Sequence, residues 1–235
     1  MPIRIEDPFR DPTLRLRKEV NPYVERLIEG SADGSLQALY GPQLKGKKGE
    51  WLSYAKTRTG RSFKQLIVEV GSHKGEVLIQ MAAANPETFF LGLDITFKRV
   101  VGLADRAAAE GLDNVLALLC NGRALTQIFN QAELAGMIVF FPDPWIKKKR
   151  QQKNRLVDEN FLSDLAEVLA PGGSFWFKTD HRPYFEDGAA LADRKFTREE
   201  KRLFLAESNY PSNFEKRFTE KNLPTYSGSW RADFT

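Results

Sequence analysis

Residues 65–94 read QLIVEVGSHKGEVLIQMAAANPETFFLGLD, and this stretch decides the fold. It begins with a short apolar, β-branched run, Gln65–Val70, which is typical of a buried parallel strand. A glycine turn follows, and Lys74–Ala84 then has apolar residues at the spacing of one helix face. A second apolar run, Thr88–Leu93, comes next. The order strand, glycine turn, helix and strand predicts a βαβ unit.

The same alternation continues toward the C-terminus. Further helices are predicted over Phe97–Glu110, Leu125–Leu134 and Phe161–Leu169, and further strands over Val115–Leu119, Met137–Phe141 and Ser174–Lys178. Strands that alternate with helices predict right-handed crossovers and a mostly parallel α/β sheet with helices on both faces. Ligands of such sheets bind outside the carboxyl ends of the strands. The residues that end each strand are therefore the candidates for a site.

The first quarter of the chain lacks this alternation. Residues 1–64 are polar and rich in Gly and Pro, with a short helical pattern around Asn21–Glu29. We therefore expect an N-terminal basic extension over residues 1–64 and one α/β domain over residues 65–235. Monomer and homodimer both stay open.

Composition excludes several classes of protein. The chain has 235 residues, of which 42% are hydrophobic, and its formal net charge is +4. A chain of this length buries roughly 70% of the surface that its unfolded form exposes, so predominant disorder is excluded. No apolar run reaches the ~18 residues of a membrane span, and the acids and prolines of residues 1–12 do not form a signal peptide. We expect no membrane partner and a cytoplasmic protein.

The rarer reactive residues do not suggest a metal or a nucleophile. Cys120 is the only cysteine, so an intrachain disulfide is excluded, and no histidine partner is evident for it. Ser212 lacks the G-x-S-x-G pattern of a hydrolase nucleophile. His73 and His181 have no spacing suited to a metal, and we expect none.

Basic residues are clustered along the chain. An acid-free run directly follows the predicted strand that ends at Phe141, and it consists of Lys147, Lys148, Lys149, Arg150, Lys153 and Arg155. A second set lies in the N-terminal third and consists of Lys45, Lys47, Lys48, Lys56, Arg58, Arg61 and Lys64. A third set around Arg194–Arg202 contains acids and is expected to be a solvated face. The first two sets are expected to contact the phosphates of a polyanion.

The ends of the first three predicted strands suit a nucleoside. Gly71 and Gly75 allow a ligand to approach the backbone, although a tight βα turn alone also uses such glycines. The dinucleotide fingerprint would need glycine where the chain has His73 and Glu76, so a pyrophosphate site is disfavoured. At the ends of the next two strands, the carboxylate of Asp94 can accept hydrogen bonds from both ribose hydroxyls, and an Asn121 amide can meet an adenine edge.

An acid before the glycine turn, Glu69, completes an arrangement that resembles class I S-adenosylmethionine-dependent methyltransferases, whose fold is Rossmann-like. The most specific block is residues 140–157, FFPDPWIKKKRQQKNRLV. It resembles the F-x-D-P-W-x-K-K-R-H-x-K-R-R-L block of the bacterial tRNA (guanine(46)-N7)-methyltransferase family. The segments FKTD at 177–180 and SNFEKRF at 212–218 are similar to later motifs of the same family.

This resemblance implies S-adenosylmethionine as cofactor, tRNA as partner, and methyl transfer to N7 of the variable-loop guanine. It assigns cofactor contacts to Glu69, Asp94, Asn121 and Asp143, beside the turn glycines Gly71 and Gly75, and substrate contacts to Lys147, Asp180, Ser212, Asn213, Phe214 and Glu215. The chain departs from the family pattern at His73, where the central glycine of E-x-G-x-G-x-G is usual.

The expected chemistry is alignment, because guanine N7 carries a lone pair and no proton. A carboxylate, Asp143 or Asp180, is expected to accept hydrogen bonds from N1–H and the exocyclic amine of guanine, with Asp143 preferred as the catalytic group. Loop capping by Asp143 and helix capping by Asp180 are the structural alternatives. Trp145, Phe214 or Phe218 could stack on the base.

Three other functions remain to be weighed. His73 leaves room for a catalytically silent RNA-binding module on the same fold. The same fold could also methylate another nitrogen in RNA, DNA or protein. An NAD-linked oxidoreductase is already weakened by His73 and Glu76.

Overall fold

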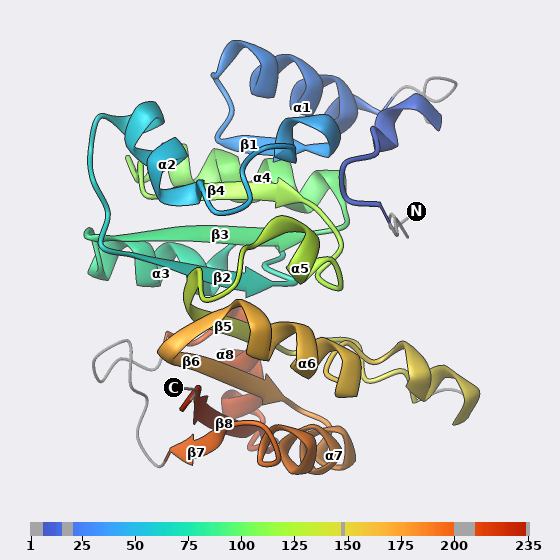
Figure 1. Ribbon diagram of the computed structural model, residues 1–235. Helices are drawn as coiled ribbons and strands as arrows, with labels where there is room; N and C mark the ends of the chain where they lie inside the picture. The colour runs from blue at the N-terminus through green and yellow to red at the C-terminus, as the bar shows by residue number, and fades with distance from the viewer. Residues whose placement is uncertain (1–6, 16–20, 147–148, 200–209, 234–235) are drawn as a thin grey trace.

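The computed structural model describes residues 7–15, 21–146, 149–199 and 210–233 (Figure 1). Within these ranges the strands form one eight-stranded sheet in the order β1-β4-β3-β2-β5-β6-β8-β7. The strands are β1 (Ala38–Tyr40), β2 (Gln65–Val70), β3 (Thr88–Asp94), β4 (Val115–Leu119), β5 (Leu134–Phe140), β6 (Leu169–Thr179), β7 (Thr197–Glu199) and β8 (Tyr226–Arg231). β1 to β6 pair in parallel, whereas β8 runs antiparallel to both β6 and β7. The predicted mostly parallel α/β sheet is confirmed.

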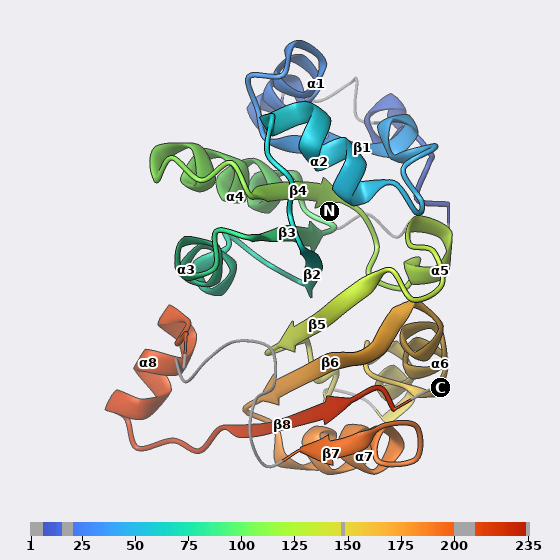
Figure 2. The same ribbon diagram turned by 60° about the vertical axis from the view of Figure 1, so that its left-hand side comes forward.

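Helices cover both faces of the sheet (Figure 2). They are α1 (Pro22–Asp33), α2 (Trp51–Thr59), α3 (Glu76–Ala84), α4 (Phe97–Ala109), α5 (Leu125–Ile128), α6 (Glu159–Val168), α7 (Arg182–Ala192) and α8 (Asn213–Glu220), with 3-10 helices at Pro12–Arg15, Gly41–Leu44 and Lys149–Asn154. Side chains of α1, α3 and α4 form one apolar cluster with the sheet, and those of α2, α5, α6 and α7 form another. The sheet therefore lies between two cores.

Two predicted strands have the same bounds in the structure, namely β2 and β4. In β4 every residue is buried, and in β2 all but the first are buried. Such strands are easily read because a strand covered on both faces is a nearly continuous apolar run. The carboxyl ends of β2, β3 and β4 meet at one edge, since Val70 pairs with Leu93 and Asp94 with Leu119.

The N-terminal segment expected as an extension contributes to the same fold. β1 pairs in parallel with β4 and forms one edge of the sheet, with Ala38 opposite Ala117. Trp51 of α2 is fully buried, and its indole Nε1–H donates to the carbonyl of Ile128 at 3.1 Å. Three-residue strands and isolated buried aromatics leave no periodic pattern, so local sequence did not reveal them.

The predicted helix over Leu125–Leu134 is wrong beyond its first turn. α5 ends at Ile128, and Leu134 already begins β5. The residues between them form a turn in which the Glu133 carboxylate accepts from the backbone N–H of Asn130 at 2.8 Å and of Gly49 at 3.0 Å. A side chain that satisfies these backbone donors stabilises the turn over a continued helix.

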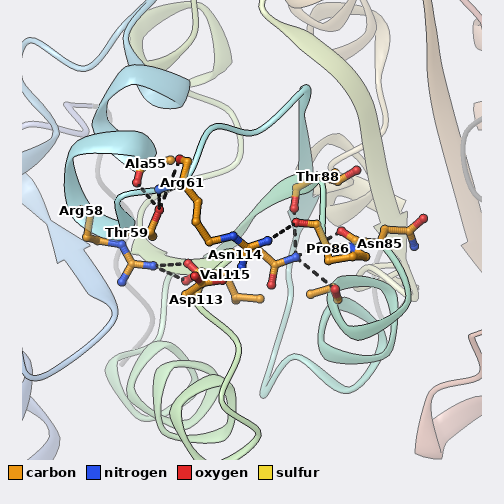
Figure 3. A network of polar contacts seen from close by, with 11 residues as sticks. Ala55, Arg58, Thr59, Arg61, Asn85, Pro86, Thr88, Asp113, Asn114 and Val115 are labelled. Carbon is orange, nitrogen blue, oxygen red and sulfur yellow. Dashed lines mark hydrogen bonds and ion pairs between the residues drawn. The ribbon is translucent and has the colours of Figure 1, made fainter.

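Two of the basic residues expected to contact phosphates hold the opposite edge of the sheet together (Figure 3). Arg58 donates to the carbonyls of Asp113 at 2.6 Å and Val115 at 3.2 Å, and Arg61 pairs with the Asp113 carboxylate at 2.5 Å. Arg61 also donates to the carbonyl of Pro86 at 2.8 Å. These partners lie where β3 and β4 begin, far along each strand from its carboxyl end. The phosphate role predicted for Arg58 and Arg61 is therefore corrected to a structural one.

Candidate active site

A cavity of about 1020 Å³ lies at the carboxyl ends of the parallel strands, between the sheet and α8. Its walls include most of the predicted site residues, namely Glu69, Gly71, Asp94, Asn121, Asp143, Asp180, Ser212, Asn213 and Phe214. Gly75 and Glu215 do not line the cavity. Lys147, together with Lys148 of the basic run, lies outside the described residues. The fold thus brings together residues that are up to about 140 positions apart in sequence.

The turn between β2 and α3 gives each glycine a different task. Gly71 has φ +77°, and a side chain there would meet nothing within 4 Å, so the backbone faces open space. At Gly75, a Cβ would lie 2.1 Å from Leu103 Cδ1, so glycine is required for α3 to pack on α4. His73 adopts φ 52°, a conformation usually left to glycine, while its side chain stays exposed. His73 is one of the residues that line the cavity, whose volume is about 1020 Å³ with this imidazole in place.

Glu69 is a buried carboxylate at the wall of the cavity. Glu69 is only 4% exposed, and its Oε2 has no hydrogen-bond partner within the described residues. Burial, with smaller contributions from Asp94 and Glu76, raises its pKa to about 8. A buried carboxylate oxygen without a partner suits a cationic group that enters the cavity.

Asp94 is held in one orientation at the end of β3. Its Oδ1 accepts from the backbone N–H of Thr96 at 2.9 Å, and its Oδ2 accepts from that of His73 at 3.2 Å. Arg99 forms an ion pair with Oδ2 at 3.5 Å. Burial raises the pKa of Asp94, whereas Arg99 and the two backbone donors oppose that shift. A carboxylate held this way can accept hydrogen bonds from a diol.

Asn121 follows β4, and its Oδ1 accepts from the backbone N–H of Arg123 at 3.0 Å. This bond orients the amide at the cavity wall. Its neighbour Cys120 is 4% exposed, and burial raises the pKa of the thiol to about 12. A thiol with that pKa is protonated at neutral pH and is not a nucleophile.

The loop after β5 is strained on both sides of Asp143. Phe141 and Trp145 both have φ 50°, although neither is glycine, and Pro142 and Pro144 restrict the backbone between them. Phe141 N–H donates to the carbonyl of Lys178 at 2.8 Å. Strained backbone of this kind persists only where the surroundings hold it, and it is concentrated at functional sites.

Arg155 holds the loop after β5 in its strained conformation. Its Nε–H donates to the carbonyl of Pro144 at 3.0 Å, and its Nη1 pairs with Asp187 at 2.8 Å. The guanidinium lies 4.7 Å from the ring centre of Tyr184. Arg155 is 7% exposed, so it orients the loop rather than meeting a polyanion, which corrects its place in the predicted basic run.

α8 closes the acceptor side of the cavity. Ser212 caps the helix, because its Oγ accepts from the backbone N–H of Glu215 at 3.1 Å. Both carboxylate oxygens of Glu215 contact Lys178 Nζ, at 2.8 and 3.1 Å, in a buried ion pair. Glu215 therefore anchors α8 to the end of β6. Phe214 is 38% exposed and packs between Phe141 and Phe218, at centroid distances of 4.8 and 4.3 Å.

The structure removes one alternative for Asp180. The residue that caps α7 is His181, whose Nδ1 accepts from the backbone N–H of Tyr184 at 3.1 Å. Asp180 instead lines the cavity. Among the described residues, no cluster of three or more His, Cys, Asp or Glu side chains could hold a metal ion. Within the same part of the chain, no helix combines the length and apolarity needed to cross a membrane.

Several contacts of the site were missed by sequence reasoning. Arg99 pairs with Asp94, Lys178 pairs with Glu215, and Glu76 accepts hydrogen bonds from Asn213. The contacts Lys178–Glu215 and Glu76–Asn213 join elements that local patterns cannot bring together, whereas Arg99 lies only five positions after Asp94. For Lys178 the sequence did hold a signal, because Lys178 is the last residue of the predicted strand Ser174–Lys178.

Comparison with known proteins gives a consistent result. A family described as putative methyltransferase matches residues 64–227. A protein of Streptococcus equi subsp. zooepidemicus named tRNA (guanine-N(7)-)-methyltransferase is 35% identical over 164 residues, which are 68% of this chain and 77% of that protein. A protein of the same name from Latilactobacillus sakei subsp. sakei is 31% identical over 68% of this chain and 78% of its own length. A Fusobacterium nucleatum protein named bifunctional glycosyltransferase/methyltransferase is 31% identical over 76% of this chain, which spans only 28% of that longer protein.

Solved structures share the fold at low sequence identity. The 16S rRNA methyltransferase KamB has a TM-score of 0.55 at 17% identity and covers 72% of this chain and 88% of its own. A 16S rRNA (adenine(1408)-N(1))-methyltransferase mutant from Catenulisporales acidiphilia, crystallised with the cosubstrate S-adenosylmethionine, has a TM-score of 0.52 at 18% identity, covering 78% of this chain and 90% of its own. The chain therefore has the class I methyltransferase fold.

Proposed function

This chain belongs to the tRNA (guanine-N7-)-methyltransferase family, and we propose that it transfers a methyl group from S-adenosylmethionine to N7 of the variable-loop guanine of tRNA. The observation that carries the proposal is the cavity of about 1020 Å³, which is lined by the strand-end residues Glu69, Asp94 and Asn121 together with Asp143. A cavity of that size can hold an adenosyl donor together with a purine acceptor.

The donor side of the cavity has the groups that S-adenosylmethionine requires. This cofactor supplies an electrophilic methyl group on a sulfonium when bound. The Glu69 carboxylate, whose Oε2 lacks a partner in the described protein, would hold a cationic group of the cofactor. Asp94 would accept hydrogen bonds from the ribose hydroxyls, and Asn121 would meet the adenine edge. The absence of any phosphate in this cofactor agrees with a site walled by carboxylates.

The acceptor side would work by alignment. Guanine N7 attacks with its own lone pair, so no side chain has to remove a proton, and the positive charge that forms lies on the guanine ring. Asp143 would accept hydrogen bonds from the N1–H and amine edge and stabilise that charge, with Asp180 as its neighbour on the cavity wall. Alignment of two bound reactants can lower a barrier by about 7–11 kcal/mol. Trp145 and Phe214 offer aromatic surface for the base.

His73 does not favour the silent RNA-binding module. Its side chain is exposed, and its backbone N–H serves the site by donating to Asp94 at 3.2 Å. We infer that histidine replaces glycine here at the cost of backbone strain and without loss of the cofactor cavity.

The decisive experiment is incubation of the protein with labelled S-adenosylmethionine and unmodified tRNA, followed by chemical cleavage at 7-methylguanosine. We expect label in tRNA and one cleavage site, in the variable loop. Label at another nucleotide would contradict the proposed position of methylation. Binding of tRNA without any binding of S-adenosylmethionine would contradict the proposal that the protein is a methyltransferase.

A further inference from the structure

α8 is attached to the rest of the molecule mainly by polar contacts. Of its eight residues, Asn213–Glu220, only Glu215 is buried, and Phe214 and Phe218 are partly covered by each other. Figure 2 shows α8 and α3 on the same side of the sheet. A helix with so little buried apolar surface depends on its hydrogen bonds and ion pairs for its position.

One of these contacts joins the first residue of α3, next to the turn after β2, to the first residue of α8. Glu76 Oε2 accepts from the backbone N–H of Asn213 at 2.8 Å, and Oε1 accepts from Asn213 Nδ2 at 2.7 Å. Beside this pair, Gln80 Nε2 donates to the carbonyl of Pro211 at 3.2 Å. The carboxylate thus lies at the N-termini of both α3 and α8, where both helix dipoles favour a negative charge and the first backbone donors lack intrahelical partners.

The two anchors of α8 act at different points. Lys178 holds Glu215 from the sheet, and Glu76 holds Asn213 from α3. Two separated attachments determine the direction of a helix, whereas one would allow it to pivot. Phe214, between the two anchored residues, and Arg217, two positions after Glu215, line the cavity.

We propose that Glu76 is a positioning residue for the acceptor base, acting through Asn213 to set α8, and with it Phe214 and Arg217, against the cofactor half of the cavity. The inference rests on the proposed methyl transfer to tRNA. Both oxygens of Glu76 are already engaged by Asn213, in contrast to Glu69, whose Oε2 has no partner among the described residues. Glu76 therefore acts on the acceptor side although it lies beside the cofactor turn.

An exchange of the two side-chain groups tests this pairing. Glu76→Leu removes the carboxylate that accepts from Asn213, and Asn213→Asp places a carboxylate before Glu76, so each single change removes the side-chain hydrogen bond. The double variant E76Q/N213D restores it with donor and acceptor exchanged, while the amide oxygen introduced at position 76 still accepts from the backbone N–H of position 213. Glu25→Gln is the matched control, because Glu25 lies in the first turn of α1 and is exposed.

We expect each single variant to raise KM for tRNA about fivefold or more, with a smaller change in kcat and an unchanged Kd for S-adenosylmethionine. The double variant should return KM to within about twofold of the parent protein. Unchanged kinetics in the single variants, an equal loss of cofactor affinity, or a double variant no better than the singles would each overturn the proposal.

A second measurement separates this proposal from the proposed function. Amide hydrogen exchange over residues 211–220 reports the attachment of α8 without any reaction. We expect faster exchange there in both single variants and recovery in the double variant. If the parent protein does not methylate tRNA but exchange follows this pattern, the proposed function fails while the Glu76–Asn213 attachment stands. Exchange that is the same in all four proteins would overturn the attachment itself.

Discussion

At the scale of single residues, Glu69 is a buried carboxyl group, and one of its oxygens has no hydrogen-bond partner among the described residues. Its pKa of about 8 in the folded protein exceeds the ordinary value of 4.5 because burial disfavours the ionised form. Between these pH values the folded state holds a proton that the unfolded chain has lost. The contribution of Glu69 to stability is therefore fully present below pH 4.5 and is lost as the pH rises through 8.

We predict that Glu69→Gln makes the cofactor-free protein more stable at pH 9 by roughly 1–3 kcal/mol and leaves its stability at pH 4 unchanged. The same variant should bind S-adenosylmethionine at least about tenfold more weakly, because the amide cannot balance a cationic group. Urea unfolding at both pH values and calorimetric titration measure the two effects. A gain in stability that is equal at pH 4 and pH 9 would contradict the buried charge.

Asp143 carries the prediction that concerns chemistry. We expect Asp143→Asn to lower kcat/KM for tRNA about 100-fold, because the change removes the carboxylate that we propose to stabilise the developing charge. Asp180→Asn should cost less. Asp105→Asn is the control, because Asp105 forms an exposed ion pair with Arg26 and does not line the cavity. A larger loss at Asp180 than at Asp143 would exchange the roles of the two carboxylates.

At the scale of elements, the packing of α3 on α4 depends on Gly75. The φ of +71° and a Cβ position 2.1 Å from Leu103 Cδ1 both oppose any side chain there. We predict that Gly75→Ala lowers the free energy of unfolding by about 2–4 kcal/mol, the sum of backbone strain and overpacking. Gly111→Ala has similar φ strain but meets nothing within 4 Å, so it should cost only about 1 kcal/mol. Chemical denaturation compares the two variants, and equal losses would refute the packing argument.

The local sequence predicts the turn between β2 and α3 but not the role of each of its glycines. The pattern G-x-x-x-G predicts a turn before a helix, and β2 and α3 confirm that turn. The task of each glycine depends on what lies across from it. Gly71 faces open space, whereas Gly75 faces Leu103 of a helix that begins 22 residues later at Phe97.

At the scale of the whole molecule, charge is distributed between two edges of the sheet. Lys153 and Arg217 line the cavity at the carboxyl edge, whereas Arg58 and Arg61 hold the amino edge. A tRNA whose guanine enters the cavity would therefore place its phosphates near the carboxyl edge.

We predict that Lys147, Lys148 and Lys149 changed together to Ala weaken tRNA binding and make the slope of log affinity against log salt shallower by about 2–3. Lys56→Ala and Lys64→Ala form the control pair. Lys64 lies just before β2 at the amino edge and pairs with Glu87, and Lys56 lies in the last turn of α2, so this prediction revises the phosphate contact expected of both and has them leave the slope unchanged. Filter binding at several salt concentrations measures both. An unchanged slope in the triple variant would exclude a role of these lysines in phosphate contact.

The chain by itself determined the parallel core and the groups at its strand ends. β2 and β4 were readable because strands buried on both faces are nearly continuous apolar runs, and Glu69, Asp94 and Asn121 follow from where such strands end. Only the tertiary structure decided the edges and the attachments, such as β1 beside β4 and Glu76 on Asn213. The physical reason is separation along the sequence. A periodic pattern of burial depends on residues that are close in sequence, whereas a hydrogen bond between residues 137 positions apart forms only when the chain has folded.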